Sequence, residues 1–361
     1  MVEQNWSGRG QHVEFDKADR RAVDDILQVE EVLGSTNSAI VQSVKCKRIR
    51  LARKTIRCNR HLTKEMAIDE VAHMSRLDHA HVVRVIGTYT MGSDLSILMY
   101  PVADYNLRSF LQQIYISETG FDYWRSIVKS LPNFFGCLSS AVQHIHSRMT
   151  KHMDIKPQNI LVRRNTAVEQ QHRESAFKVY IADFGISRTY ESLDATETEG
   201  PTMFTRKYAA PEVVDQQRRG LPADVFSLGC VFLEILVALA NLMKPVPSLR
   251  YADYFWLLNP EAHNLAQMHE ALQDQLQKTL KSNEYGDSSY QANLIAVQNF
   301  LSAIGKDKPG YRFLILQIAC MISSDALERP TAEVLAGFWK TRAPCCVEGA
   351  DPLEAAPLNT N

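Results

Sequence analysis

The feature that most constrains this 361-residue chain is an ordered series of three short polar motifs in its middle third. The first, at 152–159, reads His-Met-Asp-Ile-Lys-Pro-Gln-Asn and contains a carboxylate, an ammonium and an amide. Asp-Phe-Gly follows at 183–185, and Ala-Pro-Glu at 210–212. An eight-residue match alone could arise by chance, but the order of the three motifs argues against chance.

These motifs resemble the catalytic loop, the metal-binding motif and the end of the activation segment of protein kinases. The lysine two residues after the aspartate resembles the serine/threonine class. The resemblance implies that Asp154 accepts the hydrogen bond of a substrate hydroxyl and that Lys156 neutralises charge on the γ-phosphate of ATP. It assigns Asn159 and Asp183 to Mg²⁺. It also implies that Thr205, seven residues before the last motif's glutamate, bonds the catalytic Asp and Lys.

A strand-rich pattern over 29–57 and a helical pattern over 63–77 precede the motifs. Side chains alternate across a strand, so Ala52 and Lys54 share one face. The resemblance implies that Lys54 contacts the α- and β-phosphates and that an ion pair with Glu70 holds it there. Taken alone, Lys54 would be one more solvent-facing lysine in a basic segment, and the order of the motifs reverses that interpretation.

The same resemblance implies a nucleotide pocket between two lobes. A glycine-rich loop beginning at Gly34 would cover the phosphates. The positions expected to surround the adenine are Val41 and Ala52 as the roof, Leu161 as the floor, Met99 as the gatekeeper, and the backbone near Tyr100 and Val102.

Three further positions match structural features of the family. Asp224 is expected to anchor the backbone of the catalytic loop, and His152 to pack beneath that loop rather than act as a base. Arg329, in a late Arg-Pro-Thr motif, is expected to pair with Glu212.

The chain departs from the family pattern at two places. In the loop at 34–41 only Gly34 remains, because Thr36 and Ala39 replace the later glycines. Side chains there should weaken phosphate contact, since glycine lets backbone amides approach closely. Met153 replaces the arginine that pairs with a phosphate on the activation segment. These departures keep open an alternative: a weakly active kinase or a pseudokinase scaffold that binds nucleotide or a protein partner.

The cysteines and the longest apolar segment indicate in which cellular compartment the protein is expected. The seven cysteines are odd in number and include no C-x-x-C pair, so we expect reduced thiols without a metal site in an intracellular protein, cytoplasmic or nuclear. The adjacent Cys345 and Cys346 are expected to be exposed. The apolar stretch 225–243 contains Glu234 near its centre, so we interpret it as a buried helix and not as a membrane span.

The net charge and the basic segment 45–60 indicate which classes of partner to expect. The formal net charge of −1 gives no general attraction to nucleic acid or anionic membrane. The segment 45–60 has eight Lys or Arg and no acid, which leaves open the docking of an acidic partner. Nucleic acid is not expected, because no aromatic residues interleave with these charges.

We therefore expect an α+β, two-lobed protein-kinase fold with a small β-rich lobe containing one helix and a larger, mainly helical lobe. The expected division is a polar N-terminal extension at 1–24, the N-lobe at 25–100, the C-lobe at 101–342 and a disordered tail at 343–361. The resemblance implies a serine/threonine kinase that uses ATP and Mg²⁺ and takes a protein substrate with a Ser or Thr acceptor.

Overall fold

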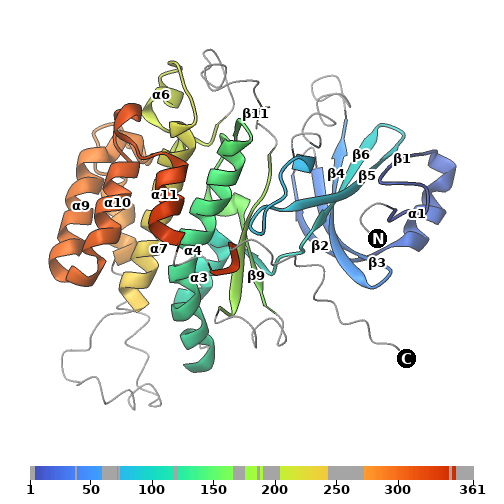
Figure 1. Cartoon of the computed structure of the whole chain (residues 1–361), viewed down its shortest axis with the longest axis horizontal. Coiled ribbons are helices and arrows are strands. Elements are labelled where there is room, and N and C mark those ends of the chain that lie inside the picture. Colours follow the sequence, from blue (N-terminus) through green and yellow to red (C-terminus); the bar gives the residue numbers. More distant parts are fainter. Residues whose placement is uncertain are drawn as a thin grey trace.

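A computed structural model describes most of the chain. A sheet-rich N-lobe and a helical C-lobe lie side by side (Figure 1), which confirms the predicted two-lobed α+β architecture. The described residues are 5–36, 39–58, 71, 74–116, 121–165, 175–184, 188–189, 204–242, 272–340 and 344–346.

Six strands form the N-lobe sheet in the order β1-β5-β6-β4-β3-β2. Neighbouring strands are antiparallel, except that β1 pairs with β5 in parallel. The elements of this lobe are β1 (His12–Phe15), the 3-10 turn η1 (Lys17–Asp19), α1 (Arg20–Ile26), β2 (Leu27–Ser35), β3 (Ala39–Cys46), β4 (Ile49–Arg57), β5 (Arg84–Met91) and β6 (Asp94–Tyr100).

The N-terminal extension is part of the N-lobe. Trp6 is 1% exposed and packs with Phe15 and Tyr89, at ring-centroid distances of 6.4 and 5.7 Å. Its indole Nε1 donates to the Gln11 carbonyl at 2.9 Å. A β carbon at Gly87 would overlap both the indole and that carbonyl, so only glycine fits there. This strand was not predicted from the sequence, because β1 is short and its partner β5 is distant along the chain.

The C-lobe is built around helices with small sheets on its N-lobe side. β7, β9 and β10 form one sheet, and β8 pairs with β11. The elements are β7 (Tyr105–Asn106), α3 (Leu107–Ile116), α4 (Phe121–Ser147), β8 (Thr150–Lys151), η2 (Pro157–Asn159), β9 (Ile160–Arg164), β10 (Phe177–Ile181), β11 (Arg188–Thr189), η4 (Arg206–Tyr208), α6 (Pro211–Val214), α7 (Pro222–Leu242), η7 (Gln291–Asn293), α9 (Leu294–Asp307), η8 (Pro309–Tyr311), α10 (Arg312–Met321), η9 (Ala326–Glu328), α11 (Ala332–Trp339) and η11 (Pro344–Cys346).

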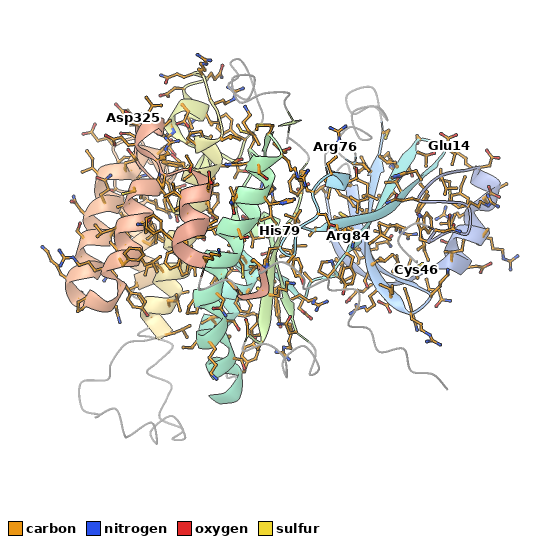
Figure 2. The ribbon with its side chains drawn as sticks, viewed as in Figure 1. Glu14, Cys46, Arg76, His79, Arg84 and Asp325 are labelled. Atoms are coloured by element: carbon orange, nitrogen blue, oxygen red, sulfur yellow. The ribbon has the colours of Figure 1, made fainter. Side chains whose placement is uncertain are left out.

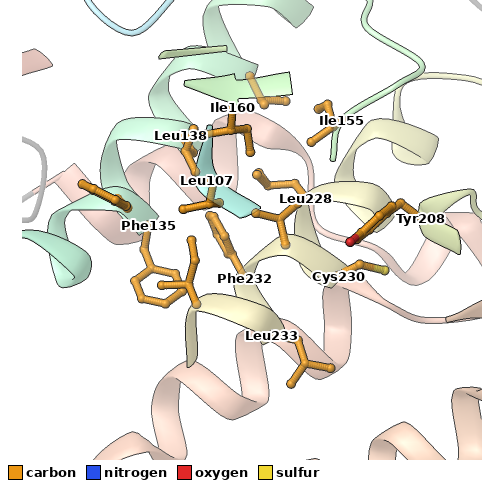
Figure 3. Close-up of a cluster of buried hydrophobic side chains, with 14 of the residues drawn as sticks. Leu107, Phe135, Leu138, Ile155, Ile160, Tyr208, Leu228, Cys230, Phe232 and Leu233 are labelled. Carbon is orange, nitrogen blue, oxygen red and sulfur yellow. The ribbon is translucent and has the colours of Figure 1, made fainter. Parts of the chain in front are cut away.

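Helix α7 is the centre of the C-lobe core. It is apolar on all sides, as expected of a helix surrounded by protein. Within the described chain it is the one helix long and apolar enough to cross a membrane, and it is buried along its whole apolar window. Figure 3 shows this core, in which α7 contributes Leu228, Cys230, Phe232 and Leu233, and other elements contribute Leu107, Phe135, Leu138, Ile155, Ile160 and Tyr208.

Glu234, the carboxylate in the middle of α7, is hydrogen-bonded through one of its oxygens inside the core. Its Oε1 accepts hydrogen bonds from Tyr208 at 2.9 Å, Tyr290 at 3.0 Å and the Lys207 ammonium at 3.1 Å. Buried polar groups are tolerated when they are paired in this way. The three donors explain why a charged residue is stable in this helix.

The interlobe loop at 79–83 precedes β5 and is hydrogen-bonded to the C-lobe. His79 lies at their junction (Figure 2). The Val83 N–H donates to the Ile181 carbonyl at 2.9 Å, and the Ile181 N–H donates to the His81 carbonyl at 2.8 Å. This loop thereby lies against the end of β10, two residues before Asp183.

Candidate active site

One buried carboxylate holds the catalytic loop at 152–159. Asp224, at the start of α7, is 1% exposed and accepts the backbone N–H groups of His152 at 2.8 Å and Met153 at 2.7 Å. His146 Nε2 donates to it at 3.0 Å. Burial would raise the pKa of Asp224, but the hydrogen bond and charge of His146 and the backbone hydrogen bond from His152 lower this pKa below its ordinary 3.8. The predicted anchor is present, and the contact with His146 was not foreseen.

His152 and Met153 fix the shape of the loop. His152 Nδ1 accepts the Asp154 N–H at 3.3 Å, and Nε2 therefore donates to the Ala182 carbonyl at 3.1 Å. The ring lies 4.6 Å from that of Phe184 and is fully buried, as expected for a structural histidine. Met153 has a φ of 67°, which is uncommon for a residue with a side chain. Such backbone strain is typical of functional sites.

The structure brings together the three polar residues expected at the reacting centre. Lys156 Nζ lies 2.6 Å from Asp154 Oδ2 and 2.8 Å from Thr205 Oγ1. The Thr205 hydroxyl donates to Asp154 Oδ1 at 2.7 Å. Asn159 Nδ2 donates to the Asp154 carbonyl and to Oδ2, both at 2.9 Å. Asp154 is thus fixed in orientation by three neighbours.

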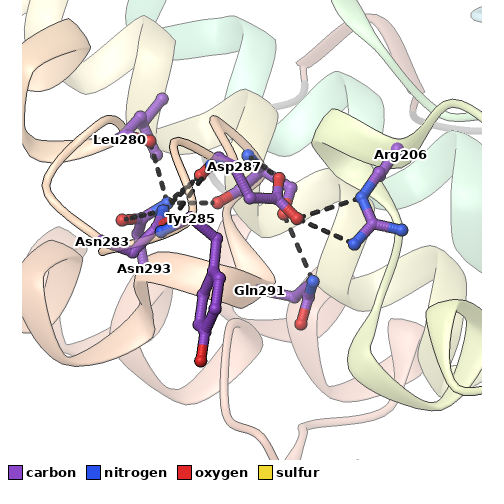
Figure 4. Close-up of polar contacts among 8 residues, drawn as sticks. Arg206, Leu280, Asn283, Tyr285, Asp287, Gln291 and Asn293 are labelled. Atoms are coloured by element: carbon purple, nitrogen blue, oxygen red, sulfur yellow. Dashed lines mark hydrogen bonds and ion pairs between the residues drawn. The ribbon is translucent and has the colours of Figure 1, made fainter.

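Contacts from the C-lobe hold the turn that carries Thr205. Arg206 donates twice to Asp287 Oδ2, at 3.0 and 2.8 Å (Figure 4). The Tyr290 N–H donates to the Lys207 carbonyl at 3.0 Å. These partners lie more than 80 residues away along the chain. Sequence reasoning missed them because no short motif surrounds Asp287.

Asp183 and Lys54 meet across the two lobes. Lys54 Nζ lies 2.9 Å from Asp183 Oδ1, and Asp183 has a φ of 65°. Burial would raise the pKa of Asp183, but the Lys54 ammonium and its hydrogen bond outweigh that effect and lower the pKa below 3.8. Glu70, the expected partner of Lys54, lies outside the described residues. The ion pair that the structure describes joins Lys54 to Asp183, the expected metal-binding residue.

Strand register places the expected pocket residues on one face of the N-lobe sheet. Val41 is paired with Gly34 on β2 and with Lys54 on β4. Ala52, two residues before Lys54, is paired with Met99 on β6. Directly paired residues and residues two apart point to the same side of a sheet. The predicted common face is therefore present.

The remaining pocket positions lie where the lobes meet. Met99 and Leu161 both pack against a small cluster of Val83, Tyr180 and Ala182. Tyr100 and Val102, in the segment that links the lobes, are half-buried, and the Tyr100 hydroxyl accepts from Arg163 at 3.1 Å.

The loop expected to cover the phosphates contains hydrogen bonds between Thr36 and Ala39. The Thr36 N–H donates to the Ala39 carbonyl at 2.8 Å, and the Ala39 N–H donates to Thr36 Oγ1 at 3.1 Å. A β carbon at Gly34 would meet no atom within 4 Å. In this arrangement the Ala39 amide N–H already donates a hydrogen bond to the Thr36 hydroxyl. Asn37 and Ser38 lie outside the described residues.

The pairing predicted between Arg329 and Glu212 is confirmed. The guanidinium binds both carboxylate oxygens, at 2.6 and 2.9 Å, and also lies 5.0 Å from the centre of the Phe226 ring. Both partners of the ion pair are buried. This contact joins the end of the activation segment to the C-terminal helices.

A pocket opens beside Asp154. Apolar side chains form most of its lining, and its free space is about that of one water molecule. The lining residues are Met153, Asp154, Ile155, Phe204, Thr205, Tyr208, Ala209, Ala210, Val213, Ala223, Asp224 and Ser227.

The sequence matches the family described as "Protein kinase domain" over residues 27–333. This match covers most of the chain, and the chain belongs to the protein kinase family.

Several curated kinases are similar to part of the chain. The "Putative mitogen-activated protein kinase kinase kinase 7-like" of Drosophila melanogaster is 28% identical over 209 residues, which is 57% of this chain and 48% of that protein. "Cell division control protein 2 homolog 2" of Trypanosoma brucei brucei is 33% identical over 171 residues, 47% of this chain and 43% of that protein. "Cyclin-dependent kinase 4" of Mus musculus is 30% identical over 175 residues, 46% of this chain and 51% of that protein. The chain spans about half the length of these relatives.

Proposed function

We propose that this protein transfers the γ-phosphoryl group of ATP to serine or threonine hydroxyls of proteins. The observation that carries the proposal is the triangle of Asp154, Lys156 and Thr205, whose polar atoms lie 2.6–2.8 Å apart. It places a hydrogen-bond acceptor beside an ammonium. Phosphoryl transfer depends mainly on such positioning and charge stabilisation.

Each charged residue of the site has a separate role in the proposed reaction. Asp154 accepts the hydrogen bond of the attacking hydroxyl and orients it. Lys156, 2.6 Å from Asp154, would neutralise charge on the transferred group, and Lys54 would bind the other phosphates from the sheet.

The donor chemistry fits a magnesium ion. Asp183 offers a half-exposed carboxylate, and Asn159 directs its amide nitrogen to Asp154, which leaves the amide oxygen as a ligand atom. Carboxylate and amide oxygens are ligands that Mg²⁺ accepts. When bound, the ion would neutralise charge on the phosphates. Asp183 and Asn159 would hold the ion, and Lys54 pairs with Asp183 at 2.9 Å.

Specificity for serine and threonine is supported by Lys156 and Thr205 together. It is also supported by relatives named serine/threonine-protein kinases in Drosophila persimilis and Caenorhabditis elegans, which are 28% and 27% identical. From its similarity to these kinases we propose that the protein is intracellular and acts on protein substrates.

A docking role for the basic segment 45–60 has weaker support. Arg50 binds Glu30 at 2.7 Å and Glu31 at 2.9 Å. Arg53 is 8% exposed and donates to Gln42 and to a tyrosine hydroxyl. Two of the charges are therefore engaged within the N-lobe.

The second candidate function is nucleotide binding without efficient transfer. The hydrogen bond from the Ala39 amide to Thr36 favours it, because that amide cannot contact phosphate while the bond exists.

Transfer of radiolabelled phosphate to a peptide mixture, measured beside nucleotide binding, tests both candidates. The Asp154→Ala variant should lose transfer and keep nucleotide binding, since Asp154 contacts the acceptor and not the nucleotide. Binding with no transfer in the wild type would select the second candidate. Equal transfer by the wild type and the variant would contradict the role of Asp154.

A further inference from the structure

A histidine and three cysteines from distant parts of the chain meet at the junction of the lobes. His81 comes from the interlobe loop, Cys137 from α4, and Cys345 and Cys346 from η11. Their ligand atoms, one imidazole nitrogen and three sulfurs, all lie within 4.8 Å of one another. The short red turn η11 is visible beside α4 in Figure 1. The expectation of an exposed cysteine pair was wrong, because Cys345 and Cys346 are half-buried against this cluster.

The distances are close to those of a tetrahedral site. His81 Nε2 lies 3.1 Å from Cys345 Sγ, and Cys137 Sγ lies 3.4 Å from the same sulfur. Bonds of about 2.3 Å to sulfur and about 2.0 Å to nitrogen give ligand–ligand separations of about 3.5–3.8 Å in a tetrahedron. Small side-chain movements would therefore bring the ligands into place. The 3.4 Å between sulfurs is far longer than the ~2.0 Å of a disulfide.

Hydrogen bonds around the cluster prepare His81 as a ligand. Its Nδ1 donates to the Val179 carbonyl at 2.7 Å, which leaves the lone pair of Nε2 directed at Cys345. Metal-binding histidines usually donate their other nitrogen in this manner. The His81 N–H donates to His79 Nδ1 at 3.1 Å, and His79 Nε2 lies 3.1 Å from the Ser140 hydroxyl. The loop is thus held against α4 independently of any ligand.

We propose that His81, Cys137, Cys345 and Cys346 bind one structural Zn²⁺ ion. Three thiolates and an imidazole are a recognised ligand set for structural zinc, and four protein ligands leave no position for substrate. Thiolate sulfur excludes Mg²⁺ and Ca²⁺, which prefer oxygen. The sequence did not indicate the site because adjacent cysteines are not a usual zinc spacing, and their partners are more than 200 residues away.

The position of the site gives the ion a structural role. It would tie the segment after α11 to α4 and to the interlobe loop. The His81 carbonyl accepts the Ile181 N–H at 2.8 Å, and Ile181 is two residues before Asp183. Zinc would therefore fasten the C-terminal segment behind β10, the strand that ends two residues before the expected magnesium ligand. The inference does not depend on kinase activity.

Metal analysis of the full chain tests the proposal. The protein should be purified in reducing buffer without immobilised-metal affinity chromatography. Inductively coupled plasma mass spectrometry should then find one zinc per chain. The variants Cys345→Ser and Cys346→Ser should lose most of this zinc while circular dichroism shows that they remain folded. Cys320→Ser is the matched control, because Cys320 is exposed on α10 away from the cluster, and it should retain zinc.

A second measurement avoids the folding of variants. Removing zinc from the wild-type chain with a chelator should lower its melting temperature, and one equivalent of zinc should restore it. Co²⁺ added to the stripped protein should give the visible absorption of a tetrahedral thiolate site. Wild-type protein without zinc, whose melting temperature does not respond to added zinc, would overturn the proposal. A disulfide between any two of the three cysteines under native conditions would overturn it as well.

Discussion

Replacing Asp224 with asparagine tests how the catalytic loop is held. The carboxylate accepts three N–H groups, from His146, His152 and Met153, at 2.7–3.0 Å. An amide has one oxygen, so in either orientation its NH₂ group faces a backbone N–H that then has no acceptor. The substitution barely changes volume, so its effect reports hydrogen bonding and charge.

The expected cost is about 3 kcal/mol. A buried N–H without a partner costs about 1–3 kcal/mol, and hydrogen bonds to a charged acceptor are stronger than neutral ones by about 1 kcal/mol. Unfolding entropy is about 2 cal/mol/K per residue, so a lobe of about 240 residues should melt about 6 °C lower. The assay is scanning calorimetry of the wild type and of Asp224→Asn. The exposed Asp215→Asn should change stability by less than about 0.5 kcal/mol.

The pH dependence gives a second check on the same variant. The pKa of Asp224 is lowered below 3.8 in the folded state, so its ionised form stabilises the protein above that value. This stabilisation is lost as the pH falls through the lower, folded pKa. The difference in melting temperature between wild type and Asp224→Asn should therefore be constant near neutral pH and shrink below about pH 4. A melting temperature within 1 °C of the wild type at pH 7 would refute the reasoning.

Three further variants test other contacts. Arg329→Met should cost about 3–5 kcal/mol in urea unfolding, because it leaves a buried carboxylate unpaired; a loss below 1 kcal/mol would contradict this. Gly87→Ala should cost about 1–3 kcal/mol by overlap with the N-terminal segment and make that segment sensitive to protease, whereas Gly310→Ala, with no atom within 4 Å, should not. Thr36→Gly with Ala39→Gly should lower the KM for ATP about two- to fivefold, since the freed amide gains more than the loop loses in entropy; an unchanged or raised KM in steady-state kinetics would mean that this loop covers ATP in another way.

Local patterns and a family resemblance predicted much of the fold and the candidate site. Alternation along one strand placed Ala52 and Lys54 on a common face, and the register confirms it. The resemblance predicted the contact between Thr205 and Asp154, which the structure contains. These predictions depend on short spacings or on motifs with a known geometry.

The contacts that were missed all join segments far apart in the chain. Trp6 and Gly87 fit together only because a short N-terminal strand pairs with β5. Cys137 and Cys345 are 208 residues apart. Nothing in either segment alone indicates its partner, since long-range packing is decided by the whole fold. The pairing of the N-terminal strand with β5 and the cysteine cluster could therefore be found only in three dimensions.

Two residues of the candidate site have a strained backbone and are held by contacts with residues far away in the chain. Met153 and Asp183 both adopt positive φ angles, of 67° and 65°. Each such conformation costs about 1–3 kcal/mol and persists only where the surroundings enforce it. The hydrogen bond from the Met153 N–H to Asp224 and the ion pair between Asp183 and Lys54 are the contacts that offset the cost. We therefore expect Asp224→Asn to reduce phosphoryl transfer more than nucleotide binding, because the strained catalytic loop relaxes while the face of the N-lobe sheet stays intact.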